Sequence, residues 1–259
     1  MPLADGYIAL KQKTNQLAGN LDRWMKEHKK ESFSLPYAYP CDNYISSILS
    51  NEWVYAALQK FANKYCNDQI QLLISKSTLV SEQSYPNLYS LILDCCHILN
   101  TDIIPKVYIT NELLGINALS VGTDVSPLVF VSPKSVIALS NKELKFMLGH
   151  ELGHIAQKNL MCHTIKGVLD GLNKKSDVLG PMVADLIDVP LNQWYRCAEY
   201  TADRAGLICC KDIDVAKKLL LSFADPEEDK ALLEYFELDN VHPYMQNRVN
   251  ELIRFNINL

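Results

Sequence analysis

The stretch His150-Glu151-Leu152-Gly153-His154 constrains the fold of this chain more than any other. It reads H-E-x-x-H, and side chains four residues apart on a helix lie on one face. Two imidazoles on one face suit two of the ligands of a tetrahedral zinc ion. Glu151 directly follows the first histidine, where such sites place a general base beside the metal-bound water. So short a pattern also occurs by chance, and it is then a surface histidine pair on an ordinary helix. The residues around the motif must decide between this interpretation and a zinc site.

The surroundings of the motif predict a buried helix over residues 141–159. Ser140 and Glu143 have the spacing of a capping box, in which hydroxyl and carboxylate satisfy the free N–H groups at a helix start. Apolar residues then recur at helical spacing, among them Leu144, Leu148 and Leu152. A buried glutamate between two histidines is costly unless it has a partner or a chemical role, which disfavours the surface pair.

A second predicted helix, residues 193–210, carries two carboxylates that could complete the site. Glu199 and Asp203 are four apart, on one face, among small apolar residues. Carboxylates facing a packed surface need a cation, and two histidines, one glutamate and a water form a known catalytic zinc shell. We therefore expect Glu199 as the third ligand and Asp203 as the acceptor for a ligand imidazole N–H. The alternative is a surface ion pair with Arg196 and Arg204.

Hydrophobic periodicity predicts a mostly helical chain with one small sheet. We expect helices at residues 3–24 and 44–65, a proline-containing linker at 32–40 between them, and further helices at 88–99 and, as a pair, within 160–188. We expect strands at residues 69–75, 106–110, 117–121 and 128–132. Pro190 and Asn192 should open the helix that carries Glu199.

Composition excludes several other classes of protein. Hydrophobic residues make up 48% of the 259, enough for a globular core, and the net charge of −5 argues against a nucleic-acid-binding surface. We expect no secretory signal and no membrane-spanning segment, because no apolar run approaches about 20 residues. The expected location is therefore cytoplasmic or otherwise soluble. None of the eight cysteines forms C-x-x-C, and we expect buried free thiols.

Several separated motifs, in the same order, resemble the HtpX-like and CAAX prenyl protease group of zinc metallopeptidases, which are gluzincins by fold. The likeness runs over residues 81–249. Its motifs are Tyr85-Pro86, residues 105–108, Asn117-Ala118, residues 148–155, Trp194-Tyr195-Arg196, Glu199, residues 202–207, His242-Pro243 and Arg248.

The resemblance implies an α+β, mostly helical, zincin-like core with a three- to four-stranded sheet beside the H-E-x-x-H helix. It implies one zinc ion per chain, bound by His150, His154 and Glu199, with Glu151 as the base and Asp203 orienting a zinc-bound histidine.

The resemblance also implies roles for residues outside the metal shell. Asn117, Ala118 and Leu119 would lie on the strand that holds the substrate backbone. His242 and Arg248 would approach the site and stabilise the oxyanion.

We therefore expect a zinc-dependent metalloendopeptidase in residues 67–259, acting on a peptide or protein and not on nucleic acid. Residues 1–66 would form a helical region that supports or regulates it. Many relatives have membrane helices that are absent here, which predicts a soluble form. Two alternatives stay open: a zinc-stabilised binding protein without turnover, and a latent protease held by its N-terminal helices or by residues 160–190.

Overall fold

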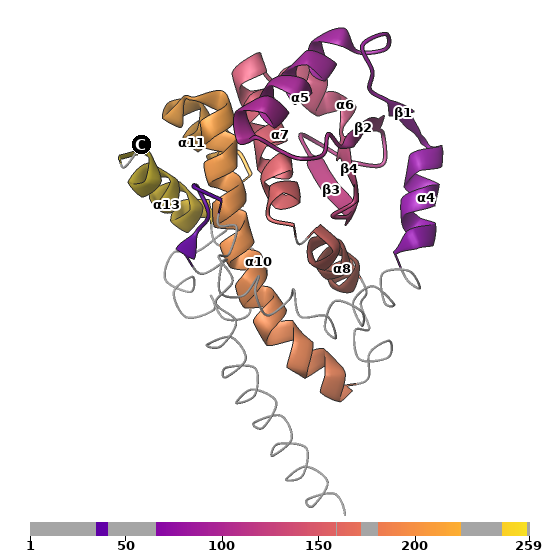
Figure 1. Ribbon diagram of the computed structural model, residues 1–259, viewed down its shortest axis with the longest axis vertical. Helices are drawn as coiled ribbons and strands as arrows, with labels where there is room; N and C mark the ends of the chain where they lie inside the picture. Colours follow the sequence, from indigo (N-terminus) through magenta and orange to yellow (C-terminus); the bar gives the residue numbers. More distant parts are fainter. Residues whose placement is uncertain (1–34, 41–65, 159, 172–180, 224–244, 258–259) are drawn as a thin grey trace, which may run out of the picture. The chain divides into compact units, whose positions relative to one another are not determined.

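The computed structural model describes residues 35–40, 66–158, 160–171, 181–223 and 245–257 (Figure 1). They belong to one unit of the fold, Leu35–Leu259. The helices predicted at residues 3–24 and 44–65 lie outside the described residues. The predicted domain boundary at residue 66 therefore stays a prediction.

Four strands form a mixed sheet in the order β1-β2-β4-β3. They are β1 (Ser77–Leu79), β2 (Lys106–Thr110), β3 (Ala118–Thr123) and β4 (Ser126–Val131). Strands β2 and β4 are parallel, whereas β1–β2 and β3–β4 are antiparallel. The described helices outnumber these strands, so the predicted α+β, mostly helical class with a small sheet is confirmed.

The strand predicted at residues 69–75 is wrong, because this segment is helix α4 (Asn67–Ser75). Its apolar residues Ile70, Leu73 and Ile74 pack against the sheet residue Phe130 and its neighbours. Their spacing is three and four residues, which is the helical period. The short apolar run therefore has a pattern that fits a helix as well as a strand.

Helix α7 (Asn141–Ala156), which carries the H-E-x-x-H motif, lies among several other helices and the strand β3 (Figure 1). Helices α5 (Pro86–Leu99), α8 (Leu160–Gly171), α10 (Pro181–Cys210) and α11 (Ile213–Leu221) all pack on it, as does β3. The others are α6 (Pro133–Ala138) and α13 (Met245–Ile257), of which α13 packs on α10 and α11. Among the described helices, none is long and apolar enough to cross a membrane.

The start of α7 has the predicted capping box. The Glu143 N–H donates to Ser140 Oγ, and the Ser140 N–H donates to Glu143 Oε2 at 2.8 Å. The predicted start of α10 is wrong: the helix begins at Pro181 and continues through Pro190. A proline lacks the N–H of one helical hydrogen bond, yet its fixed φ is helical, so one such residue does not have to end a long helix.

Cysteine chemistry differs from the prediction at one described position. Six cysteines are buried free thiols, as expected: Cys66, Cys95, Cys96, Cys162, Cys209 and Cys210. Cys197 is disulfide-bonded, and there the prediction of free thiols is wrong. The prediction relied on the absence of C-x-x-C spacing, which carries no information about bonds between distant parts of a chain.

Small residues let α7 and α10 approach closely, and this approach positions the polar residues of both helices. A Cβ added at Gly153 would lie 2.8 Å from the Cα of Ala202, and one added at Gly149 would lie 2.8 Å from the Cβ of Cys209. Both distances are far below a van der Waals contact. Gly149 and Gly153 are one helical turn apart on α7. Each therefore faces the backbone or a short side chain of α10.

We expect Gly153→Ala to destabilise the fold by about 1–3 kcal/mol, since the new methyl group must push the Ala202 backbone away. Metal binding should weaken as well, because the two helices separate. Denaturant unfolding and zinc titration would measure the two effects. Gly115→Ala is the control: its φ of 68° carries a backbone cost, but nothing lies within 4 Å of the added Cβ. Unchanged stability and zinc affinity in Gly153→Ala would contradict the tight helix contact.

Candidate metal centre

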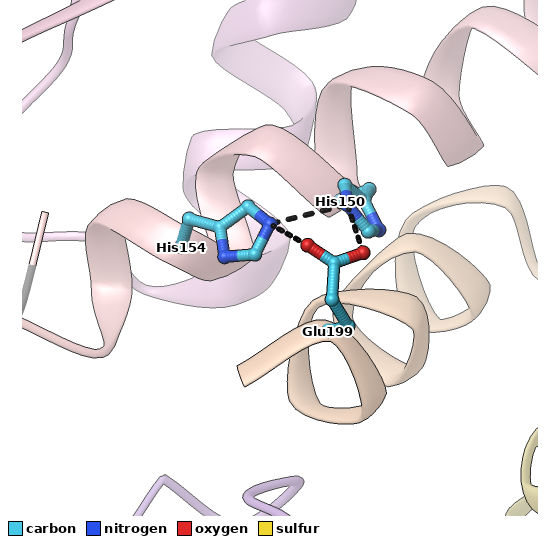
Figure 2. A group of neighbouring side chains, drawn as sticks. All are labelled: His150, His154 and Glu199. Atoms are coloured by element: carbon cyan, nitrogen blue, oxygen red, sulfur yellow. Dashed lines mark hydrogen bonds and ion pairs between the residues drawn. The ribbon is translucent and has the colours of Figure 1, made fainter. Parts of the chain in front are cut away.

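The H-E-x-x-H residues of α7 face two carboxylates of α10. Figure 2 shows the imidazoles of His150 and His154 and the carboxylate of Glu199 turned toward one another. Each contributes one donor atom to a group in which all the atoms lie within 4.8 Å of one another. His154 and Glu199 are buried and His150 is partly exposed, so the group lies at the boundary of the core.

The spacing of the three donor atoms fits a small tetrahedral ion. His150 Nε2 lies 3.2 Å from His154 Nε2 and 3.6 Å from Glu199 Oε2. His154 Nε2 lies 3.3 Å from Glu199 Oε1. Bonds of about 2.0–2.1 Å in a tetrahedral shell separate neighbouring ligand atoms by about 3.3–3.4 Å. The described side chains can therefore hold such an ion from one side.

Asp203 fixes the orientation of the first histidine. Its Oδ1 lies 3.0 Å from Nδ1 of His150, on the side of the ring opposite the group of donor atoms. A proton on Nδ1 then donates to Asp203 and leaves Nε2 as the free lone pair, the arrangement that a metal-binding histidine needs. The carboxylate of Asp203 is almost completely buried, so it is held in place.

Arg248 of α13 links the carboxylates of Glu199 and Asp203 on α10. Its Nε and Nη2 donate to the two oxygens of Asp203 at 2.8 and 2.6 Å, and its Nη1 lies 3.0 Å from Glu199 Oε2. Only 6% of Arg248 is exposed. A buried, two-point arginine–carboxylate pair is both directional and strong. All three guanidinium nitrogens are therefore engaged by carboxylates.

The buried charges change the ionisation of their neighbours. Burial acts to lower the pKa of His150, but the hydrogen bond to Asp203 and the charges of Glu199 and Asp203 raise it above its ordinary value. Burial acts to raise the pKa of Asp203, but Arg248 and His150 hold it below its ordinary value. Burial would lower the pKa of Arg248, and the same two carboxylates raise it instead. Each shift favours the ionised form.

Glu151 supplies a further buried carboxylate beside the donor group. It is 7% exposed, and its Oε2 has no hydrogen-bond partner among the described residues. Glu199 and Asp203 supply two further buried carboxylates close by. Buried carboxylates require pairing with positive charge, and a metal cation can supply part of it. The donor set thus fits a metal ion.

Two aromatic neighbours of His154 were missed by sequence reasoning. The ring of His163, on α8, lies 4.2 Å from that of His154 between centroids. The ring of Tyr195, on α10, lies 5.1 Å from that of His163 and is stacked on it. The three rings come from three different helices, so no local spacing in the sequence could have indicated this contact.

The structure places the other predicted site residues in different ways. Ala118 and Leu119 are the first two residues of β3, and Asn117 directly precedes them. His242 lies outside the described residues. Arg204 donates to the carbonyl oxygens of Tyr37 and Ala38 at 3.4 and 3.0 Å. Glu199 and Asp203 are buried, so the surface ion pair considered as an alternative does not describe them.

Comparisons with known proteins agree with this arrangement. The Peptidase family M48 model matches residues 85–255. The chain is 30% identical over 160 residues to the plastoglobule-localized metallopeptidase 48, chloroplastic, of Arabidopsis thaliana, covering 61% of this chain and 46% of that protein. It is 24% identical over 179 residues to a protease HtpX homolog of Methylibium petroleiphilum, covering 59% and 62%. A protease HtpX homolog of Polynucleobacter necessarius is 23% identical over 172 residues, with 56% and 58% covered.

The matched region spans less than two thirds of the length of these relatives. No solved structure shows a significant match to the chain. The family match covers well over half of the chain and includes α7, α10 and α13, which carry the candidate metal centre. The chain therefore belongs to peptidase family M48 and is classed with the metallopeptidases.

Proposed function

We propose that this protein is a zinc-dependent metalloendopeptidase that hydrolyses internal peptide bonds of a peptide or protein. One observation carries the proposal: the donor group of His150, His154 and Glu199 lies beside Glu151, whose buried Oε2 has no partner among the described residues. Metal ligands alone would not require that carboxylate. A base next to a metal site is what the hydrolysis of an amide needs.

The residues divide the chemistry between them. When bound, the zinc ion would polarise the scissile carbonyl and lower the pKa of a water toward about 7. His150, His154 and Glu199 would hold the ion. Glu151 takes a proton from the attacking water and passes it to the leaving amine. Asp203 keeps Nδ1 of His150 protonated, so that Nε2 stays available to the metal.

Arg248 and His242 take separate roles in this proposal. The three nitrogens of Arg248 are engaged by Glu199 and Asp203, which favours a positioning role over the oxyanion role first expected. Arg248 would fix the ligand carboxylate and the carboxylate that orients His150. His242, which follows from the family resemblance, remains the proposed donor to the oxyanion.

Substrate binding is proposed at the edge of the sheet. β3 is an outer strand of the sheet and packs against α7 and α8 (Figure 1). An extended peptide can add to such an edge through main-chain hydrogen bonds, which do not depend on the side chains of the peptide. Asn117, Ala118 and Leu119 lie at the start of this strand and would hold the substrate backbone.

We expect one tightly bound zinc ion per chain when the protein is purified without added metal. The reason is the group of donor atoms on His150, His154 and Glu199 and the buried carboxylate of Glu151 beside it. Elemental analysis measures the zinc content per chain. Protein in which manganese or cobalt replaces the zinc is the comparison. Less than roughly a tenth of an equivalent, with no uptake on reconstitution, would contradict the site, because structural and catalytic zinc sites bind tightly.

The activity itself is tested with a peptide library of unbiased sequence, incubated with zinc-loaded protein and analysed by mass spectrometry. Cleavage at internal bonds, abolished by a chelator and restored by zinc, is the expected result. Trimming from the ends only would make the protein an exopeptidase. Bound zinc with no cleavage at all would favour the alternative of a zinc-stabilised binding protein.

A further inference from the structure

His154 lacks the kind of partner that orients His150. Its Nε2 is the atom that approaches His150 and Glu199, so Nδ1 is the nitrogen that carries the proton when a metal is bound (Figure 2). This Nδ1 is buried and has no hydrogen bond to another described residue, whereas Nδ1 of His150 lies 3.0 Å from Asp203. A metal-bound histidine normally donates this N–H to a carboxylate, a carbonyl or water, and the bond fixes its ring. Another contact must therefore fix the ring of His154.

Aromatic rings lie against His154. The centroid of the His163 ring is 4.2 Å from that of His154, with an angle of 38° between the two planes. The Tyr195 ring is stacked on His163 at 5.1 Å and lies 6.5 Å from His154. The ring of His150 meets His154 edge-on at 4.8 Å. His154, His163 and Tyr195 are all buried. The torsion that turns an imidazole about its Cβ–Cγ bond is soft, so close packing of this kind can restrict it.

The position of His163 is itself fixed, because α8 is bound to the sheet on both sides of this residue. Asp124, in the turn between β3 and β4, accepts the Leu160 N–H at 2.8 Å. The hydroxyl of Thr164 accepts the N–H of Gly122 on β3 at 2.9 Å. These two bonds hold the first turn of α8 in place, and His163 lies on that part of the helix.

We propose that His163 is a positioning residue of the metal centre: its ring, with Tyr195 stacked on it, holds the imidazole of His154 at the angle that metal binding needs. Tyr195 is four residues before Glu199 on α10, so the aromatic stack adjoins the helix face that supplies the third ligand. The two histidines of the motif are then oriented by different means, His150 by a hydrogen bond and His154 by ring packing. This inference rests on the proposed function, in which His154 is a zinc ligand.

The test is the zinc affinity of His163 variants, measured by competition with a chromophoric chelator. His163→Ala removes the ring and should weaken zinc binding about tenfold, the lower end of the usual loss when a residue that orients a ligand is removed. His163→Phe keeps a flat ring without nitrogen and should bind zinc nearly as well as the original protein. His163→Gln keeps polarity without a ring and should resemble His163→Ala, which it replaces if that variant does not fold.

Two results would overturn the proposal. One is an unchanged zinc affinity in the folded variants that lack the ring. The other is a His163→Phe protein that binds zinc as weakly as His163→Ala, which would assign the role to a ring nitrogen and not to ring packing.

The visible spectrum of cobalt-loaded protein separates this role from a general effect on stability. Its bands report the arrangement of ligand atoms around the metal, so they should change in His163→Ala and be preserved in His163→Phe. Ile165→Ala is the matched control, because Ile165 is also buried on α8 but lies two residues further on, on a different face. The control should unfold at a lower denaturant concentration and keep the zinc affinity and the cobalt spectrum.

Equal changes of the cobalt spectrum in Ile165→Ala and His163→Ala would also overturn the proposal, since His163 would then only support the fold. Neither measurement uses a substrate. A protein that binds zinc but never cleaves a peptide therefore contradicts the proposed function and not this inference.

Discussion

Glu151→Gln is expected to keep the fold and the zinc ion and to lose peptide hydrolysis by about a hundredfold or more, the usual scale for removing a general base. The amide has the shape of the carboxylate but cannot take a proton from water. Burial makes the comparison clean, because the side chain is 7% exposed and its Oε2 has no hydrogen bond to another described residue that the change would break. Rates on the best library peptide, with zinc content measured on the same samples, give the result.

Glu143→Gln is the matched control for this change. Glu143 is also a glutamate of α7, but its carboxylate bonds to Ser140 in the capping box at the other end of the helix. Its loss should reduce stability by about 1 kcal/mol or less and leave the turnover of folded protein unchanged. Hydrolysis near the original rate in Glu151→Gln would remove Glu151 as the base. Loss of zinc would instead make it a part of the metal shell.

Local sequence patterns predicted the parts of the site that lie on a single helix. The spacing of His150 and His154, the capping box and the four-residue step from Glu199 to Asp203 depend only on helical geometry. The pairing of the two helices also followed, because a metal shell needs a third ligand and buried carboxylates need a cation. These are requirements of chemistry, and they apply wherever in the chain the residues occur.

Other features depend on contacts between distant segments, and no local pattern encodes them. Arg248 was expected near the oxyanion, yet its guanidinium is engaged by Glu199 and Asp203 of α10. The ring of His163 lies 4.2 Å from that of His154, and α8, which carries His163, is bound to the β3–β4 turn. The prediction of a strand at residues 69–75 was wrong for a related reason: a short apolar run fits both periods, and packing on the sheet makes it a helix.

Arg248→Met is expected to destabilise the protein by about 3–5 kcal/mol, the usual cost of removing one partner of a buried ion pair. Methionine retains much of the length and apolar volume, so the change is mainly electrostatic. The change leaves the carboxylates of Glu199 and Asp203 buried without the guanidinium. Both side chains should then change position or bind a water molecule. Zinc affinity should fall as well, because the ligand carboxylate and the carboxylate that orients His150 lose their common support. Denaturant unfolding and competitive zinc titration measure the two effects.

Two further variants make the outcome specific. Arg248→Lys keeps the positive charge but not the planar guanidinium that contacts both carboxylates. Its stability and zinc affinity should lie between those of the original protein and those of Arg248→Met. Arg254→Met, on the same helix, removes an exposed pair with Glu251 and should change stability by less than about 1 kcal/mol. A residue that acted only on the oxyanion would lower kcat and leave stability and zinc affinity unchanged. That pattern in Arg248→Met would overturn the positioning role, because the contacts to Glu199 and Asp203 would then contribute nothing to holding the metal site.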